Sequence, residues 1–441
     1  MTLPLPVLSA WDPRAASAGS IDPLGALRAY TAIAQYLVPG ATTITTRVRY
    51  LSWLCAGLYL LDECADAPSG GTAGRSRRQR LLAWERFLAL ATTYYGNSAQ
   101  LGIDAPAWRG LRGISYVRRA VEQGRTTTEF ELLRNQAGVG GVGTYWVTLV
   151  HGGLVENLSG ELTARGRLLA EQFLKPIGAK LPSGFEDMLQ GTTPSFGRDE
   201  LARWGKQLSL DVSQVSRREI QALRDALLEP RTQRRLHEAM APFKAMGSSH
   251  KAFGQLERQL KRQRDPEAAT MAEVMQLTRA FEAVHAGLLD RFDRLLSLDA
   301  KGAPVQRATA AGSLMGFQSL TESGRALGDL LGSLRNVPGE VATPTRHFLA
   351  SVQAILVAQP GDALLVELCR HHERVQSGKL DAARQPKQAW LALQGNTLVI
   401  SPRFALDAPP EVRDPDDFTH PYRIESFSGM LRELPEKGVA A

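Results

Sequence analysis

Residues 145–174 read Tyr-Trp-Val-Thr-Leu-Val-His-Gly-Gly-Leu-Val-Glu-Asn-Leu-Ser-Gly-Glu-Leu-Thr-Ala-Arg-Gly-Arg-Leu-Leu-Ala-Glu-Gln-Phe-Leu. Gly152 and Gly153 can adopt the positive φ that ends a helix. Residues 154–162 then provide two short extended pieces around a Ser-Gly turn. Thr163 is a favourable N-cap for the residues that follow. The sequence therefore predicts the order helix, strand, turn, strand, helix.

The flanking residues complete this expected module. Residues 129–136 favour a short helix, and the glycine-rich residues 137–143 favour a turn before a helix over 144–151. After the second strand, four apolar residues recur at helical spacing and are expected to close the hydrophobic core: Leu168, Leu169, Phe173 and Leu174.

These features resemble the winged helix-turn-helix modules of bacterial transcription regulators. The resemblance rests on Gly152 and Gly153, on the Leu-Val-Glu strand and on the Leu-Thr-x-x-Gly-Arg-x-Leu-Ala stretch, and it covers roughly residues 105–180. In that family the helix before the wing enters the major groove and presents polar or basic side chains to the bases.

The charges of this module leave two interpretations open. Residues 135–164 contain no Lys or Arg, whereas groove binding normally uses basic side chains. A nucleic acid could still be contacted by Thr144, Tyr145 and Thr148 at base edges and by Arg134, Arg165 and Arg167 at phosphates. Alternatively, the wing is a module for packing or for docking a partner, since a fold does not determine a function.

The length and composition indicate a multi-domain globular protein. The chain has 441 residues, 44% of them hydrophobic and 22% charged, which is too long for one ordinary core. Its three cysteines are too few and too scattered for a disulfide framework, so we expect a reducing, cytoplasmic location. The proline-broken N-terminus is not expected to be a signal peptide, and the run at 51–61 is too short to span a membrane.

The net charge of +7 is concentrated in one segment. Residues 231–264 contain nine Lys or Arg and two acids, and they are predicted to form a basic helical hairpin broken near Gly247. Such a hairpin can follow phosphates without reading sequence, although a charge run can also be a solvated face. The candidate nucleic-acid contacts are Arg231, Arg234, Arg235, Lys251, Arg258, Lys261, Arg262 and Arg264, with Arg134, Thr144, Tyr145, Arg165 and Arg167 from the wing region.

The predicted fold class is mainly α, with a winged-helix module and a small C-terminal β appendage. Five segments are expected: an N-terminal helical domain (1–104), the winged-helix-like module (105–180), a helical domain with the basic hairpin (198–299), a further helical domain (305–384) and a β-containing segment (385–441). Residues 390–393 and 397–400 read as two strands around a Gly-Asn turn. A strongly amphipathic helix is expected over 271–298.

No catalytic or metal-binding constellation is predicted. The glycines at 138–143 lack the preceding strand and the Gly-Lys ending of a phosphate loop. His371 and His372, beside Cys369 and Glu373, are adjacent on a helix and point apart, so they are expected to be packed or surface histidines. Asp62, Glu63 and Asp66 are interpreted as a solvated helix end. Asp362 and Glu367 faintly resemble a nuclease core, but Cys369 stands where a lysine is expected.

As a whole, the chain resembles the mostly helical accessory proteins found beside helicases and nucleases in bacterial anti-phage islands. This resemblance rests on residues 22–25, 46–51, 145–174, Trp390 and 420–423. It implies a non-enzymatic subunit, without cofactor or metal, that binds nucleic acid through its backbone, most simply DNA, and positions a partner enzyme such as a helicase or nuclease. The alternatives are a purely structural interaction subunit and, least favoured, a divergent nuclease.

Overall fold

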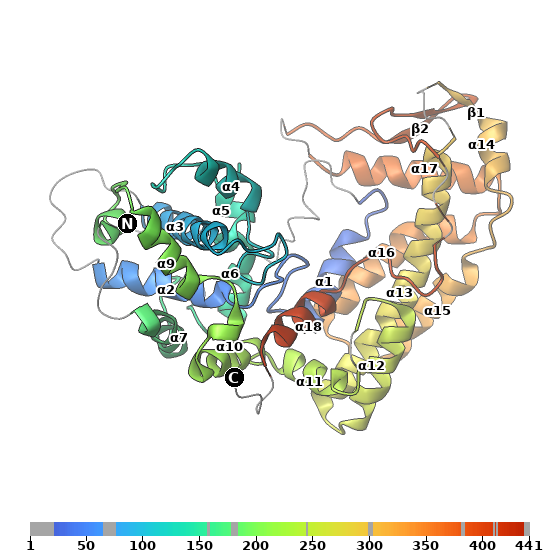
Figure 1. The fold of residues 1–441 in the computed structure, drawn as a ribbon. Helices are drawn as coiled ribbons and strands as arrows, with labels where there is room; N and C mark the ends of the chain where they lie inside the picture. The colour runs from blue at the N-terminus through green and yellow to red at the C-terminus, as the bar shows by residue number, and fades with distance from the viewer. Residues whose placement is uncertain are drawn as a thin grey trace. The chain divides into compact units, whose positions relative to one another are not determined.

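The computed structural model describes residues 22–64, 76–156, 159–177, 184–243, 246–298, 303–380, 384–408, 411 and 413–435 (Figure 1). This part of the chain is mainly α-helical, with a small three-stranded antiparallel sheet near the C-terminus. The chain separates into two compact units. Unit 1 contains residues 38–234 and the residues from 426 onward, and unit 2 contains residues 235–425 together with the helix before residue 38. Each unit therefore combines residues from several of the five predicted segments.

Unit 1 is built around α2, which is buried on nearly all sides. It contains α2 (Tyr50–Glu63), α3 (Arg77–Ser98), α4 (Ile114–Glu122), α5 (Gln136–Val139), α6 (Gly141–His151), α7 (Ala164–Leu174), α8 (Phe185–Leu189), α9 (Arg198–Leu208) and α10 (Arg217–Leu227). Helix α2 contacts α3, α6 and α7 (Figure 1). Trp53 and Trp84 are buried in this core, and the Trp84 indole donates a hydrogen bond to the Trp53 carbonyl. An apolar helix of this kind is stable only inside a core.

The predicted order over residues 145–174 is present in part, because both helices form but the two predicted strands are reduced, among the described residues, to a single antiparallel bridge. Helix α6 ends at His151, Gly153 has a φ of 63°, and an antiparallel bridge joins Val155 to Leu162. The Thr163 hydroxyl then accepts a hydrogen bond from the Gly166 amide and caps α7. Asn157 and Leu158, which belong to the predicted turn, lie outside the described residues. Leu169 and Phe173 are buried as expected, but Leu168 is exposed, contrary to the prediction.

The prediction for residues 129–143 was wrong in two places. Residues 129–135 form no helix, and the glycine-rich stretch contains α5 and the first turn of α6 instead of a single turn. The glycines fit because of close packing: a Cβ on Gly141 would lie 2.6 Å from the Tyr50 ring, and one on Gly143 would lie 2.3 Å from the Gly138 carbonyl oxygen. Tertiary contacts therefore override the low helix propensity of glycine.

Helices α3 and α9 pack so closely that a side chain is excluded at Gly205. A Cβ there would lie 1.9 Å from the carbonyl oxygen of Ala91, which is backbone and cannot rotate away. We expect Gly205→Ala to lower the free energy of unfolding by about 1–3 kcal/mol, the usual cost of overpacking, measured by urea denaturation. Gly332→Ala is the control, because its Cβ would meet nothing within 4 Å and should stabilise a helix by ~0.5–1 kcal/mol. Equal effects of the two substitutions would contradict the close packing.

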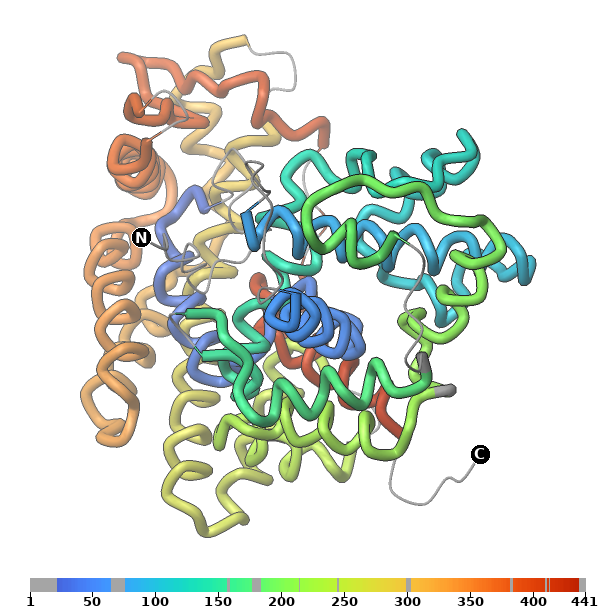
Figure 2. Tube along the Cα trace, turned by 90° about the vertical axis from the view of Figure 1, so that its left-hand side faces the viewer, coloured from blue at the N-terminus to red at the C-terminus, as the bar shows by residue number. Residues whose placement is uncertain are grey.

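Unit 2 is organised along α13, a helix of 31 residues. It contains α1 (Leu27–Leu37), α12 (His250–Arg262), α13 (Pro266–Leu296), α14 (Arg307–Ser313), α15 (Thr321–Ser333), α16 (Gly339–Val357) and α17 (Asp362–Ser377). Helices α12 and α13 lie side by side after a short turn (Figure 2), and α13 also contacts α15. Asp265 caps α13 by accepting from the Ala268 amide, and Pro266 occupies the first helical position, where its missing N–H costs nothing. Two further helices are α11 (Arg231–Met240) and α18 (Ile424–Glu433). The chain crosses from one unit to the other within each of them.

The predicted β appendage is confirmed as a hairpin in unit 2. Strands β2 (Leu391–Gln394) and β3 (Thr397–Ile400) pair antiparallel, with Leu391 opposite Ile400 and Gln394 opposite Thr397. Gly395 adopts a φ of 58° in the turn, as a tight hairpin requires. Strand β1 (Val305–Gln306), at the start of the segment predicted to be a further helical domain, pairs with the other edge of β3.

Within the ranges given above, none of the helices combines the length and the apolar character needed to span a bilayer.

Candidate functional site

The exposed face of α12 brings together several of the predicted basic residues. The helix packs on α13 through Phe253, Leu256 and Leu260, which are fully buried. On the opposite side, Lys251, Arg258 and Arg262 are exposed, and their spacing of seven and four residues places them within about 40° around the helix axis. Arg264 is exposed in the turn that follows. These four residues are called the basic face.

The basic face has no exposed acid of its own helix. Glu257 is the single acidic residue of α12, and it is nearly buried. Its carboxylate accepts from Lys261 Nζ at 2.7 Å and from Arg279 Nη1 at 3.0 Å. Lys261 is therefore paired, whereas Arg258, Arg262 and Arg264 form no ion pair with any residue that the structure describes. At the start of α12, the Asp416 carboxylate accepts from the Lys251 amide and adds a negative charge there.

The basic residues on α11 are arranged differently. Arg231 and Arg234 are exposed and belong to unit 1, and Arg234 donates to the Leu228 carbonyl. Arg235 belongs to unit 2 and forms ion pairs with Glu238 and Asp265 at 3.0 and 2.8 Å. Lys244, which contributed to the charge of the segment, lies outside the described residues. Of the described basic residues of α11, Arg235 is therefore neutralised by acids, whereas Arg231 and Arg234 belong to the other unit.

The candidate residues of the wing region are distributed between the core and the surface. Thr144 and Tyr145 are 1% and 0% exposed, and the Tyr145 hydroxyl accepts from the amides of Thr46 and Arg47. Both side chains are therefore buried and cannot contact bases, which corrects their assignment to base contacts. Arg165 pairs with Glu229. Arg134 and Arg167 are exposed.

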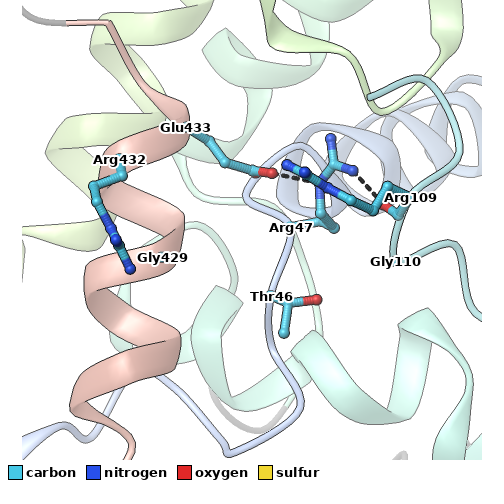
Figure 3. A pocket seen from close by; sticks show the side chains of 7 residues that line it. All are labelled: Thr46, Arg47, Arg109, Gly110, Gly429, Arg432 and Glu433. Atoms are coloured by element: carbon cyan, nitrogen blue, oxygen red, sulfur yellow. Dashed lines mark hydrogen bonds and ion pairs between the residues drawn. The ribbon is translucent and has the colours of Figure 1, made fainter. Parts of the chain in front are cut away.

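Unit 1 also contains a cavity of about 490 Å³ with a cationic lining. It is lined by Thr46, Arg47, Arg109, Gly110, Gly429, Arg432 and Glu433. Figure 3 shows Arg432 on α18 at one side and Arg109 at the other. Both arginines are exposed, and neither forms an ion pair with a described residue. Guanidinium groups are planar and present several N–H donors, which is the geometry that pairs with carboxylates and phosphates.

Arg47 holds the wall of this cavity together. Its Nε pairs with the Glu433 carboxylate, and its Nη1 donates to the Arg109 carbonyl (Figure 3). Its Nη2 donates to the carbonyls of Pro106 and Leu210 at 2.9 and 2.8 Å. Burial raises the pKa of Glu433 above its ordinary value, and the neighbouring Arg47 opposes that rise. Because all these bonds use the buried guanidinium, Arg47 serves the fold of the cavity wall and not a ligand.

The residues considered for metal or nuclease chemistry are not brought together. His371 and His372 are buried on α17 and bond the carbonyls of Leu24 and Pro23 at 2.9 Å each. Asp362 pairs with Arg307, and Glu367 pairs with Arg370. Asp62 pairs with Arg77, and Asp66 lies outside the described residues.

Unit 2 contains a different cluster of potential metal ligands, which was not predicted from the sequence. Glu282, His285 and His420 each offer one ligand atom, and these atoms lie within 4.8 Å of one another. The available signal was a Glu-x-x-His spacing on α13, which places both side chains on one face of the helix. His420 lies far along the sequence, so nothing in the sequence linked it to that pair.

Comparison with family models, curated proteins and solved structures finds no match to this chain.

Proposed function

We propose that this chain binds nucleic acid through the phosphate backbone, with the basic face of α12 as its principal contact. The observation that carries this proposal is a row of exposed arginines without acidic partners. From Lys251 to Arg262 the face extends about 16 Å along the axis, at 1.5 Å per residue. A line of fixed positive charges suits the regular line of phosphates on a nucleic acid, and such contacts position a protein without reading bases.

Within this proposal, the wing region packs inside unit 1 and does not contact nucleic acid. We propose that α6, the bridge between Val155 and Leu162, and α7 form a winged-helix-like module. A recognition helix must be exposed to enter a groove, whereas most residues of α6 are buried. The burial of Thr144 and Tyr145 therefore favours a module that stabilises unit 1 over one that reads bases.

We further propose that the chain is a non-enzymatic accessory subunit that positions a partner enzyme in a bacterial defence system. This part rests on the resemblance of residues 22–25, 46–51 and 420–423 to helical accessory proteins of anti-phage islands. The pairing of Asp362 with Arg307 and of Glu367 with Arg370 supports it, because these bonds occupy the carboxylates that a nuclease would need for a metal.

The test is a triple variant, Arg258→Ala, Arg262→Ala and Arg264→Ala. We expect affinity for duplexes of any sequence to fall by about 500-fold near 0.1 M salt. Each lost phosphate contact removes about 0.9 from the log–log salt slope, or ~2.7 for three contacts, and this difference builds up over the tenfold step down from about 1 M salt. The measurement is fluorescence anisotropy with duplex DNA and with duplex RNA between about 50 and 200 mM salt.

The matched control removes the same charge elsewhere in unit 2. Arg325, Arg335 and Arg374 are exposed and form no ion pair with a described residue. Their triple alanine variant should bind with nearly unchanged affinity, and any change should reflect net charge alone. If both variants lose affinity equally, the basic face is not the contact. If the first variant binds as the wild type does, the basic face serves an acidic protein partner or none.

A further inference from the structure

The cluster of Glu282, His285 and His420 brings together two parts of unit 2 that are far apart in the sequence. Glu282 and His285 are three residues apart on α13, and His420 belongs to the segment before α18. Beside His420, the ring of Tyr30 on α1 stacks at a centroid distance of 4.4 Å. His285 stacks on the other histidine at 4.6 Å. Three donor side chains are thus fixed in place by α1, α13 and the C-terminal segment.

The burial of this cluster suits a cation. Glu282 is 0% exposed and His285 is 4% exposed. The Glu282 carboxylate accepts from the hydroxyls of Thr419 and Tyr422 at 2.6 and 2.5 Å, and His285 Nδ1 lies 2.7 Å from the Thr419 hydroxyl oxygen. A buried carboxylate next to an imidazole offers an oxygen ligand and a nitrogen ligand away from bulk water.

The donor atoms surround the Thr419 hydroxyl, and His420 Nδ1 also lies 2.7 Å from Glu282 Oε1. The Thr419 hydroxyl oxygen lies 2.6 Å from Glu282 Oε2, 2.7 Å from His285 Nδ1 and 3.0 Å from His420 Nδ1. Zinc–ligand distances are about 2.0–2.2 Å, so an ion near this hydroxyl would require the donors to move inward by less than about 1 Å. The hydroxyl would rotate aside or become a further oxygen ligand.

We propose that Glu282, His285 and His420 form a binding site for a first-row divalent transition-metal ion, with Zn²⁺ as the preferred occupant. Two imidazoles and one carboxylate are a donor set typical of zinc and of non-haem iron. Magnesium and calcium prefer sets made of oxygen alone. The Tyr422 hydroxyl donates to Glu282 Oε1 at 2.5 Å and would hold the carboxylate in a fixed orientation.

A bound ion would join the C-terminal segment to α13. The Thr419 amide already donates to Glu282 Oε2 at 2.7 Å, so the segment is held against the helix before the ion arrives. The ion would add bonds that exist only in the folded chain, and such binding stabilises the native state. The proposed role is therefore structural, and thermal stability is a direct readout of it.

The test uses the full chain, stripped with EDTA and dialysed, and titrated with ZnCl₂ in a calorimeter. We expect one Zn²⁺ per chain and a higher melting temperature with ZnCl₂ than with MgCl₂. His420→Ala should weaken binding by about 100-fold or more, since even outer residues of metal sites change affinity 10- to 100-fold. This variant is chosen because His420 is the partly exposed member of the three, whereas Glu282 and His285 are buried.

Two further measurements keep the outcome decisive. His347→Asn removes an exposed histidine of α16 and should leave Zn²⁺ binding unchanged. Tyr422→Phe keeps all three ligands and should weaken binding by about 10-fold. A wild-type chain that takes up no stoichiometric Zn²⁺ and gains no thermal stability would overturn the proposal whether or not the variants fold. Equal binding by His420→Ala and the wild type would overturn it as well.

Discussion

Replacing Arg47 by Met is expected to lower the free energy of unfolding of unit 1 by about 3–5 kcal/mol, the usual cost of breaking a buried ion pair from one side. The Arg47 side chain is 4% exposed, and its guanidinium serves the Glu433 carboxylate and the carbonyls of Arg109, Pro106 and Leu210. Methionine fills much of the same volume but donates no hydrogen bond. These acceptors would therefore be left without the partner that offsets their desolvation.

The measurement is urea denaturation monitored by tryptophan fluorescence. Arg109→Met is the matched control, because that exposed arginine lines the same cavity, and it should change stability by less than about 0.5 kcal/mol. Combining Arg47→Met with Glu433→Gln should recover part of the loss, since the double variant no longer buries an unpaired charge. A loss below about 1 kcal/mol for Arg47→Met would contradict the role of Arg47 in the cavity wall.

Metal-free protein is expected to lose stability in unit 2 as the pH falls from 7 to 4. Burial lowers the pKa of His250, His285, His371 and His372, and the values for His285 and His372 are about 3 and 4. In the unfolded chain these imidazoles take up protons below about pH 6.5, whereas in the folded chain they stay neutral to a lower pH. The unfolded state then binds more protons, so its free energy falls relative to the folded state.

Glu282 acts in the same direction at lower pH. Its pKa of about 2 lies below the ordinary value of 4.5, so its contribution is present above about pH 4.5 and is lost as the pH falls toward 2. The combined loss by pH 4 should be on the order of 6 kcal/mol, about 3 from each of His285 and His372. The measurement is urea denaturation with EDTA at pH 7.0, 5.5 and 4.0. Unchanged or greater stability at pH 4 would contradict the buried neutral state of these histidines.

His285→Phe separates the contribution of one residue. The ring of Phe281 lies parallel to His285 at a centroid distance of 6.1 Å, so an aromatic replacement suits the site. This variant should show a smaller fall in stability between pH 6.5 and 4, because its unfolded state has one fewer group to protonate. An identical pH profile in the variant and the wild type would assign the effect to the other histidines.

Local signals were sufficient to predict several elements. The Gly-Asn turn between two apolar runs identified the β2–β3 hairpin, because its residues permit the positive φ that the turn needs. Thr163 identified the start of α7 for a similar reason, since its hydroxyl caps the Gly166 amide. The apolar periodicity over 271–298 identified most of α13. In each case the decisive interaction lies within a few residues along the chain.

Features that depend on distant residues could not be predicted. The glycines before α6 resemble a flexible turn, but the Glu85 carboxylate accepts from the Gly141 amide and fixes the first turn of that helix. Tyr145 resembles an exposed aromatic residue, yet its hydroxyl is bonded to the backbone at Thr46 and Arg47. The cluster around Glu282 needs His420 from a separate segment. No local pattern encodes these contacts.

The basic segment, residues 231–264, has some features that the sequence predicted and others that depend on distant residues. Its charge was evident in the sequence, and the helical spacing of Arg258 and Arg262 places them on one exposed face. The sequence did not show that Glu257 neutralises Lys261, or that Glu238 and Asp265 neutralise Arg235. A charge count therefore overstates the surface available to phosphates, because Lys261 and Arg235 are already paired with acids.

Hydrogen exchange of the full chain, with and without a saturating duplex, tests the central claim most directly. The proposed function predicts slower exchange in peptides covering residues 250–264, with the effect reversed by high salt, because phosphate contacts are screened and counterions compete. Peptides covering α6 should exchange at the same rate in both samples, since that helix is largely buried in the free protein. Slower exchange around α6 with no change over residues 250–264 would contradict the account.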